Sequence, residues 1–514
     1  MKDQEKIDEK LSLLAKSSLI VFLGIFLSKL FTYLYKIIVA RYYGPESYGY
    51  FSISLMVVGI FLAFASIGFA EGLNRFIPIY LIKNQKDKIN YLISVSSKLF
   101  FFTGLLSTII LFFSSDLIST RIFHSSELSI YLKIFAFTIP FNLYTYIYYS
   151  FIRGNERISA YSFGINILQN VVKFFSLILI ILFGLEASKS ISISYSIGIV
   201  SMALFGYIYC KYFLSLKLIE NFSLSKETKK YLFREIFSYS WPLFLFSIIS
   251  SFIFWIDTFS IGFLKDSYWV GIYNAALPIA LLLSVSSEIF MQLFFPIITK
   301  ELSLRRNQVV SELSKQIVKW TFIINLPVLV LIYFFPGVFI NFFWGKEYLL
   351  ASNSLRFLTI GYFVFSLASV SINLLSSKGK SKLILLNLLF ASFLNLCLNF
   401  ILIPTYGIEG AAFATMISLI LWSVLLFIES YLFVGIIPLR RKLLNVFFSA
   451  IAPALFLFYF QEYFNFGIFG LILFGAIYGV SYISLIFLTN SLDKNDFMIV
   501  KKIYSKFRES KNNL

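Results

Sequence analysis

Residues 17–40 read SSLIVFLGIFLSKLFTYLYKIIVA and residues 50–70 read YFSISLMVVGIFLAFASIGFA, with the turn RYYGPESYG (41–49) between them. Each run has the length of about 20 apolar residues that a helix needs to cross a membrane. The segment EGLNRFIPIYLIK (71–83) follows, and it is basic and interrupted by a proline. The sequence therefore predicts a membrane hairpin whose first span carries two lysines, Lys29 and Lys36.

The whole chain has the composition of a polytopic membrane protein. Of its 514 residues 59% are hydrophobic and only 14% are charged, whereas an ordinary soluble domain is about 25% charged. We therefore predict an all-α protein with fourteen transmembrane helices. The apolar runs lie near 17–40, 48–70, 92–114, 130–151, 160–183, 190–210, 238–262, 270–298, 317–336, 354–376, 383–403, 409–432, 443–461 and 467–489.

The net charge of +18 follows the positive-inside rule and does not indicate a nucleic-acid partner. The first run is too long for a signal peptide, contains two lysines and lacks a cleavage site, so residues 1–16 are expected to stay as a cytoplasmic tail. With that tail inside, every second loop between the predicted spans, beginning with the loop after the second span, faces the cytoplasm. These loops and the two tails hold most of the Lys and Arg residues. We predict a protein of the cytoplasmic (plasma) membrane with both termini in the cytoplasm.

An internal repeat divides the chain. Four short matches recur in order at an offset of about 223 residues, among them Tyr48-Gly49 with Val270-Gly271 and Phe183-Gly184 with Tyr406-Gly407. The offset covers six helices, so the copies share one orientation and are related by an axis along the membrane normal. The predicted organisation is an N-terminal tail, an N-lobe, a basic linker, a C-lobe, two extra helices and a basic tail, at 1–16, 17–210, 211–237, 238–432, 433–489 and 490–514.

The hairpin residues carry a resemblance to a known family. The Lys-x6-Lys span, the turn Ala-Arg-Tyr-Tyr-Gly-Pro-Glu-Ser-Tyr-Gly (40–49), Ser-Ile-Gly-Phe (66–69) and Asn-Arg-Phe-Ile-Pro-Ile-Tyr (74–80) closely resemble polysaccharide-biosynthesis flippases of the Wzx type. That family belongs to the MOP superfamily, with MATE drug exporters and lipid II flippases. The resemblance implies a MATE-like fold and transfer of a polyprenyl-diphosphate-linked glycan from the inner to the outer leaflet by alternating access.

Cationic side chains of the first lobe are the candidate substrate-binding residues. Lys29 and Lys36 share one helix face, about 10.5 Å apart along the axis. Lys173 follows Gln169 and Asn170 by one turn in the fifth span, and a charge inside a bilayer costs a few kcal/mol unless a cavity or partner receives it. Lysine binds phosphate as a point charge, so these residues suit a diphosphate. Snorkelling or a buried ion pair is the structural alternative.

Five further charged residues complete the predicted site. Arg75, with Pro78 breaking the helix after it, is expected to receive the diphosphate on the cytoplasmic side, although ordinary positive-inside anchoring also explains it. Lys133 and Arg356 occupy equivalent repeat positions and either flank the exit or snorkel to the interface. Asp257 and Glu288 are intramembrane carboxylates that serve either as counter-charges or in coupling to Na⁺ or H⁺.

The second lobe shows that the fold does not require the buried lysines. Lys29 and Lys36 align near Ser251 and Thr258 of the matching hairpin, which therefore has no lysine at either position. This asymmetry favours a binding role for the two lysines, and it places Asp257 in the opposite hairpin as a counter-charge.

Other functions are less consistent with the sequence. Gly379-Lys380-Ser381 lacks the first glycine of a P-loop, because Leu374 stands there, so no ATP-driven pump is predicted. A membrane-embedded polymerase or transferase would need loop-borne acids or an intramembrane His, but the only histidine, His124, lies in a predicted outer loop. No catalytic residue, metal or bound cofactor is predicted, and Cys210 and Cys397 imply no disulfide framework.

A lipid II flippase and a MATE-type drug or cation antiporter stay open as alternatives. A cation exporter would favour an acidic first lobe, whereas this one holds lysines. The Gly-Pro-Glu-x-Tyr-Gly turn argues against lipid II. The partners expected are the lipid-linked glycan, membrane lipid and possible polymerase and glycosyltransferase neighbours, with the chain itself a monomer.

Overall fold

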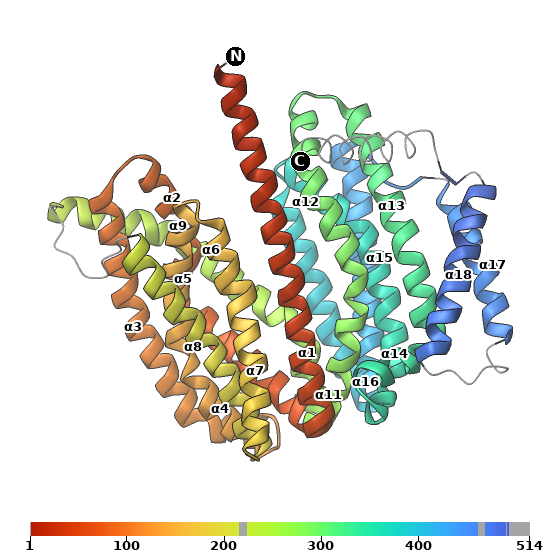
Figure 1. Ribbon diagram of the computed structural model, residues 1–514, viewed down its shortest axis with the longest axis horizontal. Coiled ribbons are helices and arrows are strands. Elements are labelled where there is room, and N and C mark those ends of the chain that lie inside the picture. Colours follow the sequence, from red (N-terminus) through yellow and green to blue (C-terminus); the bar gives the residue numbers. More distant parts are fainter. Residues whose placement is uncertain (1, 215–223, 441, 461–467, 490, 493–514) are drawn as a thin grey trace. The chain divides into compact units, whose positions relative to one another are not determined.

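The computed structural model describes residues 2–214, 224–440, 442–460, 468–489 and 491–492, and this part of the chain is helical, with no strand in it (Figure 1). Eight helices in the described part are long and apolar enough to cross a membrane, or nine if the bent pair Ser267–Ala280 and Leu282–Met291 forms one span. Two of the eight contain a non-helical glycine at which two helices meet. Each of the fourteen predicted apolar runs overlaps a helix. The prediction of an all-α polytopic fold is confirmed.

The chain divides into two compact units, Met1–Ile272 and Tyr273–Leu514. In unit 1, Lys2–Ser66 is followed by a series of shorter helices and two π-helical segments, and the boundary falls inside α11. The elements are α1 (Lys2–Ser66), α2 (Phe69–Ile82), α3 (Lys86–Leu117), η1 (Ile118–Ile122), α4 (Leu128–Ala136), α5 (Thr138–Gly154), α6 (Ile158–Ser162), η2 (Phe163–Leu168), α7 (Gln169–Leu182), α8 (Ala187–Phe213), α9 (Lys226–Phe254), α10 (Ile256–Leu264) and α11 (Ser267–Ala280).

Glycines and one isoleucine set the breaks in the first hairpin. Gly44 has φ 81°, in the left-handed region that glycine adopts without strain, and Pro45 begins the second arm, where its missing N–H costs nothing. The second arm ends at Ile67 (φ 47°) and Gly68 (φ 71°). The prediction that Pro78 breaks the helix is wrong, because Pro78 lies inside α2. Transmembrane helices tolerate proline when neighbouring groups satisfy the freed carbonyl.

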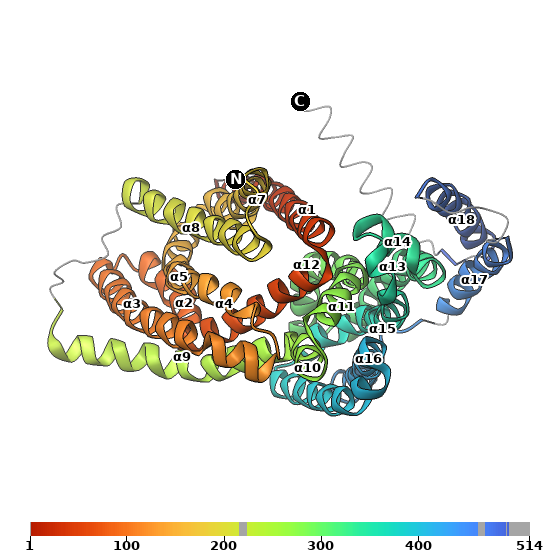
Figure 2. The same cartoon turned by 90° about the horizontal axis from the view of Figure 1, so that it is seen from below.

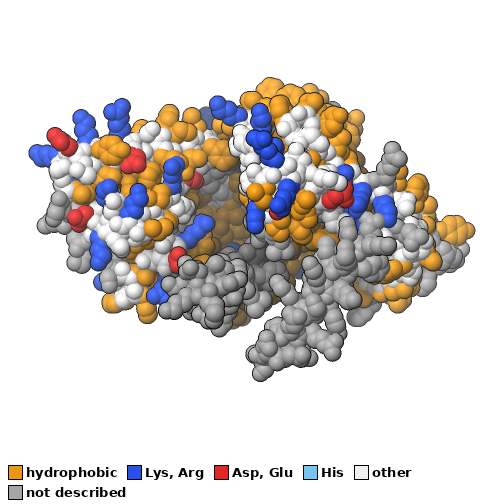
Figure 3. Space-filling model, turned by 90° about the horizontal axis from the view of Figure 1, so that it is seen from above, with side chains coloured by type: hydrophobic (Ala, Val, Ile, Leu, Met, Phe, Trp, Pro, Cys, Tyr) orange, Lys and Arg blue, Asp and Glu red, His pale blue; other side chains and the backbone are white. Residues whose placement is uncertain are grey.

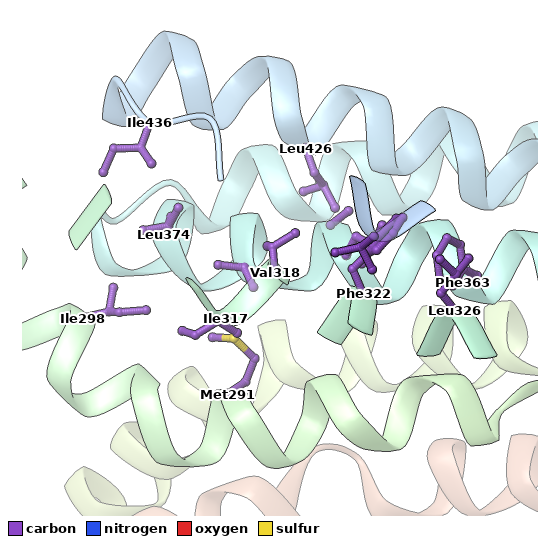
Figure 4. Packing of buried hydrophobic residues seen from close by; sticks show 14 of the residues in the cluster. Met291, Ile298, Ile317, Val318, Phe322, Leu326, Phe363, Leu374, Leu426 and Ile436 are labelled. Carbon is purple, nitrogen blue, oxygen red and sulfur yellow. The ribbon is translucent and has the colours of Figure 1, made fainter. Parts of the chain in front are cut away.

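Unit 2 is built on a continuous apolar core between α12, α13, α15 and α16 (Figure 4). Leu326, Phe363 and Leu426 are among the buried residues of this core. The elements are α12 (Leu282–Ser303), α13 (Asn307–Phe334), α14 (Pro336–Phe343), η3 (Lys346–Ala351), α15 (Ser352–Ser377), α16 (Ser381–Val434), α17 (Leu443–Phe460) and α18 (Ile468–Leu488).

The predicted repeat has a backbone counterpart. Gly184 and Gly407, which the sequence matches, have φ values of 69° and 58°, and both stand in open space. Gly407 divides α16 into two arms, as Gly44 divides α1. The proposed lobe boundaries stay a prediction, because residues 215–223 of the predicted linker lie outside the described residues.

Candidate functional site

The candidate site lies where α7 packs against the first arm of α1. These helices are neighbours in unit 1, as are α5 and α8 (Figure 2). Before α7 the chain forms the π-helical segment η2 (Phe163–Leu168), which changes the angular register of the residues that follow. Asn170 and Lys173 come directly after this segment, and their side chains are buried. Lys173 is only 5% exposed.

A chain of hydrogen bonds joins α1 to α7 and ends at the Lys173 ammonium. Asn170 Nδ2 donates to Ser28 Oγ (3.0 Å), and Thr32 Oγ1 donates to Asn170 Oδ1 (2.9 Å). Lys173 Nζ then donates to Thr32 Oγ1 over 3.5 Å, which is a long bond. The polar residues of α1 and α7 thus satisfy one another, while the ammonium forms a single, weak hydrogen bond within the described part of the chain.

Two tyrosine rings hold the Lys173 ammonium in place. Its Nζ lies 5.5 Å from the ring centroid of Tyr35 and 5.4 Å from that of Tyr195. Tyr35 is itself fixed, because its hydroxyl donates to the carbonyl oxygen of Ile191 (2.9 Å) and lies 3.0 Å from Ser194 Oγ. A desolvated cation–π contact contributes roughly 2 kcal/mol. The rings therefore stabilise the cation without cancelling its charge.

Lys29, Lys36 and Lys173 form one electrostatic group, which we call the lysine cluster. Lys36 is partly buried and interacts with the charges of both Lys29 and Lys173, and Lys29 is exposed. Across the described residues, no Asp or Glu pairs with any of the three. The cluster holds uncompensated positive charge inside the predicted membrane region. Such charge attracts anions strongly where the dielectric is low.

Arg75 lies apart from the cluster, on α2. Its guanidinium stacks on Tyr239 of α9, 4.2 Å from the ring centroid, and its side chain is exposed. Neighbouring Asn74 accepts a hydrogen bond from Ser150 Oγ (2.9 Å), which ties this turn of α2 to α5. Figure 3 shows several Lys and Arg side chains on the face seen from above.

The two cations at equivalent repeat positions have different partners. Lys133 Nζ forms a two-pronged ion pair with Asp116, at 2.9 and 2.8 Å, near the end of α3. Arg356 donates instead to the carbonyl oxygen of Tyr333 (2.9 Å) and to Asn353 Oδ1 (2.8 Å). Both side chains are partly exposed. Their proposed role at the exit stays a prediction.

The roles predicted for the two carboxylates, as counter-charges or in ion coupling, also stay predictions. Asp257 lies in α10 of unit 1, is partly buried and has an interaction of its own. It is not among the charges that act on Lys36 or Lys173. Glu288 lies in α12 of unit 2 and is exposed.

Sequence reasoning missed the residues that surround Lys173 and one buried carboxylate. Thr32, Tyr35 and Tyr195 come from positions up to about 160 residues apart, so no local pattern groups them. Glu71, in the first turn of α2, has a buried carboxylate oxygen with no hydrogen-bond partner. Its spacing of four residues from Arg75 was the available signal.

The fold is similar to that of solved transporters of the MOP superfamily. The structure is similar to that of the lipid II flippase MurJ in an inward closed conformation, with a TM-score of 0.70 over 91% of this chain and 98% of MurJ, at 20% identity. A sequence model for polysaccharide biosynthesis proteins matches residues 14–302, and a MatE model matches residues 242–401. The chain belongs to the polysaccharide biosynthesis protein family.

Two relatives extend this likeness over most of the chain. A membrane protein of Methanocaldococcus jannaschii described as uncharacterised is 25% identical over 420 residues, which are 78% of this chain and 80% of the relative. A putative O-antigen transporter of Shigella flexneri is 23% identical over 393 residues, which are 75% of this chain and 90% of the relative. The predictions of a Wzx-type, MOP-superfamily flippase of the cell membrane, rather than an enzyme, are confirmed.

Proposed function

We propose that this flippase moves a polyprenyl-diphosphate-linked oligosaccharide, the repeat unit of a surface polysaccharide, from the inner to the outer leaflet by alternating access. The observation that carries the proposal is the lysine cluster, whose positive charge has no carboxylate partner among the described residues. A buried cation without a partner is costly in a membrane unless a ligand supplies the missing charge. The relatedness to a putative O-antigen transporter supports a glycan cargo.

The graded exposure of the cluster suits a lipid diphosphate. Lys29 is exposed, Lys36 is partly buried and Lys173 is buried, so an entering headgroup meets cations at increasing depth. Each ammonium offers three donors, and a hydrogen bond between charged groups contributes roughly 1.5–3 kcal/mol. The oligosaccharide follows the headgroup, and the polyprenyl chain stays in the lipid.

The other predicted residues have secondary roles in this proposal. Arg75 receives the headgroup on the cytoplasmic side, and Lys133 and Arg356 flank the exit. Asp257 and Glu288 take part in coupling to Na⁺ or H⁺. Both termini face the cytoplasm, and glycosyltransferases and a polymerase act on the same glycan.

The test is export of surface glycan in a strain that lacks this protein and carries variants of it. Lys29→Ala and Lys173→Ala should each lower export at least about tenfold, because each removes one charge-assisted contact. Lys29→Arg should retain more activity than Lys29→Ala. The matched control is Lys98→Ala, an exposed lysine on α3. Normal export by the Lys29→Ala, Lys173→Ala double variant, at equal protein level, would refute the cationic site.

A lipid II flippase is the second candidate, because its structural likeness to this chain extends over 91% of the residues. The cluster fits its cargo as well, since both cargoes present a lipid diphosphate. Rescue of a strain depleted of its own lipid II flippase would support this candidate. Accumulation of glycan repeat units, with normal peptidoglycan, in the deletion strain would reject it.

A further inference from the structure

The second span is broken beside a tight helix crossing. α2 begins at Phe69 after the break at Ile67–Gly68 and lies directly on α9. A Cβ atom at Gly68 would overlap the carbonyl oxygen of Ser240, and one at Gly72 would approach Ser240 Oγ to 2.7 Å. Glu71 lies between these two glycines. The backbone contact therefore brings its side chain against α9.

The Glu71 carboxylate is only half satisfied. Its Oε1 accepts a hydrogen bond from Ser247 Oγ of α9, at 3.3 Å. Its Oε2 is buried and has no hydrogen-bond partner, and neither has the buried hydroxyl of Ser240. No Lys or Arg of the described segments forms an ion pair with Glu71. Leaving a buried acceptor unpaired costs about 1–3 kcal/mol, and more when the group is charged.

The natural partner of Glu71 is close in sequence but is held elsewhere. Arg75 follows by four residues, and a Glu followed by a cation at that spacing normally pairs on a helix. Here Arg75 stacks on Tyr239 instead, at 4.2 Å. The titratable side chain of Tyr146, on α5, lies within electrostatic range of the carboxylate. Among the described residues, the carboxylate therefore has no cationic partner, and its Oε2 accepts no hydrogen bond.

We propose that Glu71 binds a monovalent cation, H⁺ or Na⁺, at the break in the second span. Breaks in transporter helices are places where carbonyls of a helix end and nearby side chains bind coupling ions. α1 ends at Ser66, five residues before Glu71, and the Ser247 hydroxyl oxygen lies 3.3 Å from the carboxylate. Binding would remove the unpaired charge of Glu71. The role of this cation as the coupling ion rests on the proposed flippase function, whereas its binding to Glu71 does not.

The test measures cation binding to the purified full-length protein without any lipid-linked substrate. Thermal unfolding is followed in NaCl and in choline chloride, and as a function of pH. For the wild type we expect the unfolding temperature to rise with Na⁺ if the ion is sodium, or to change with pH alone if it is a proton. Glu71→Gln keeps the side-chain shape and should abolish whichever response the wild type shows. It should also raise the unfolding temperature without cation, because the amide carries no charge.

The control variant is Glu429→Gln, whose carboxylate already accepts a hydrogen bond from Asn387 Nδ2 (2.6 Å). It should keep the full cation response. If Glu71→Gln folds poorly, Ser247→Ala should weaken the same response several-fold without removing the carboxylate. A wild-type protein that responds to neither Na⁺ nor pH would overturn the proposal, as would equal responses in the wild type and Glu71→Gln. Because no substrate is used, such a result leaves the glycan-flippase proposal intact.

Discussion

Gly49 and Gly271 pack against each other through their backbones in a reciprocal contact. A Cβ atom at Gly49 would overlap the carbonyl oxygen of Ser267, and one at Gly271 would overlap that of Pro45. Gly271 follows Gly49 by 222 residues, and Ser267 follows Pro45 by the same number, which agrees with the offset of about 223 found in the sequence. The turn after Gly44 and the first turn of α11 therefore meet as matching parts of the internal repeat.

Gly49→Val and Gly271→Val should separate these two turns, because the overlapping atoms belong to the backbone and cannot rotate away. We expect a cysteine placed at Ser47 to react several-fold faster with a water-soluble thiol reagent in either variant. The background would lack Cys210 and Cys397. Gly59→Val is the control, since a Cβ atom there meets only Trp255 Nε1 at 3.7 Å. Unchanged labelling in both variants would contradict the inference that the contact between Gly49 and Gly271 limits access of the reagent to position 47.

Thr32→Asp should inactivate the transporter without unfolding it. The new carboxylate would replace the hydroxyl that Lys173 Nζ reaches, and would neutralise the deepest cation of the cluster. Glycan export should fall at least about tenfold, while the unfolding temperature stays equal or rises. The matched variant Thr32→Asn has a similar shape and no charge. If Thr32→Asp exported glycan normally, the charge of Lys173 would have no part in binding.

Tyr195→Leu should impair transport more than Tyr195→Phe. Phenylalanine keeps the ring beside Lys173 and the contacts with Phe51 and Phe135, whereas leucine removes the cation–π contact of roughly 0.5–2 kcal/mol. Export assays combined with unfolding temperatures separate the two effects. Equal export by the two variants, at equal stability, would show that the ring does not support the ammonium.

Breaking the pair between Lys133 and Asp116 should have a small effect. The Asp116 side chain is 66% exposed and that of Lys133 is 34% exposed, and an ion pair exposed to solvent contributes little to stability. We expect Asp116→Asn to leave the unfolding temperature nearly unchanged and export near the wild-type level. A large loss of export with Lys133→Ala but not with Asp116→Asn would instead assign Lys133 to the exit.

The sequence was sufficient for the fold because the helices depend on local apolar length and on a few turns. The Gly44-Pro45 turn and the match of Gly184 with Gly407 could both be seen in the residues. The break at Ile67–Gly68 was missed, because positive φ values there arise from packing of Gly68 on α9 and not from a local proline.

The site was predictable only in part. Lys29, Lys36 and Lys173 stood out because charge is rare in apolar runs, and the structure brings these three together. Whether a cation is paired depends on residues distant in the chain, so the different partners of Lys133 and Arg356 could not be foreseen. The π-helical segment before Asn170 also left no mark in the hydrophobic pattern.

The unpaired charge of the lysine cluster has a consequence for energy supply. In the proposed cycle, the three ammonium groups face alternate sides of a membrane whose cytoplasmic side is electrically negative. Moving one elementary charge through 100 mV changes the free energy by roughly 2.3 kcal/mol. The voltage would therefore draw the empty carrier back toward the cytoplasm, while a bound diphosphate would offset the charge and let the loaded carrier turn outward with less electrical resistance.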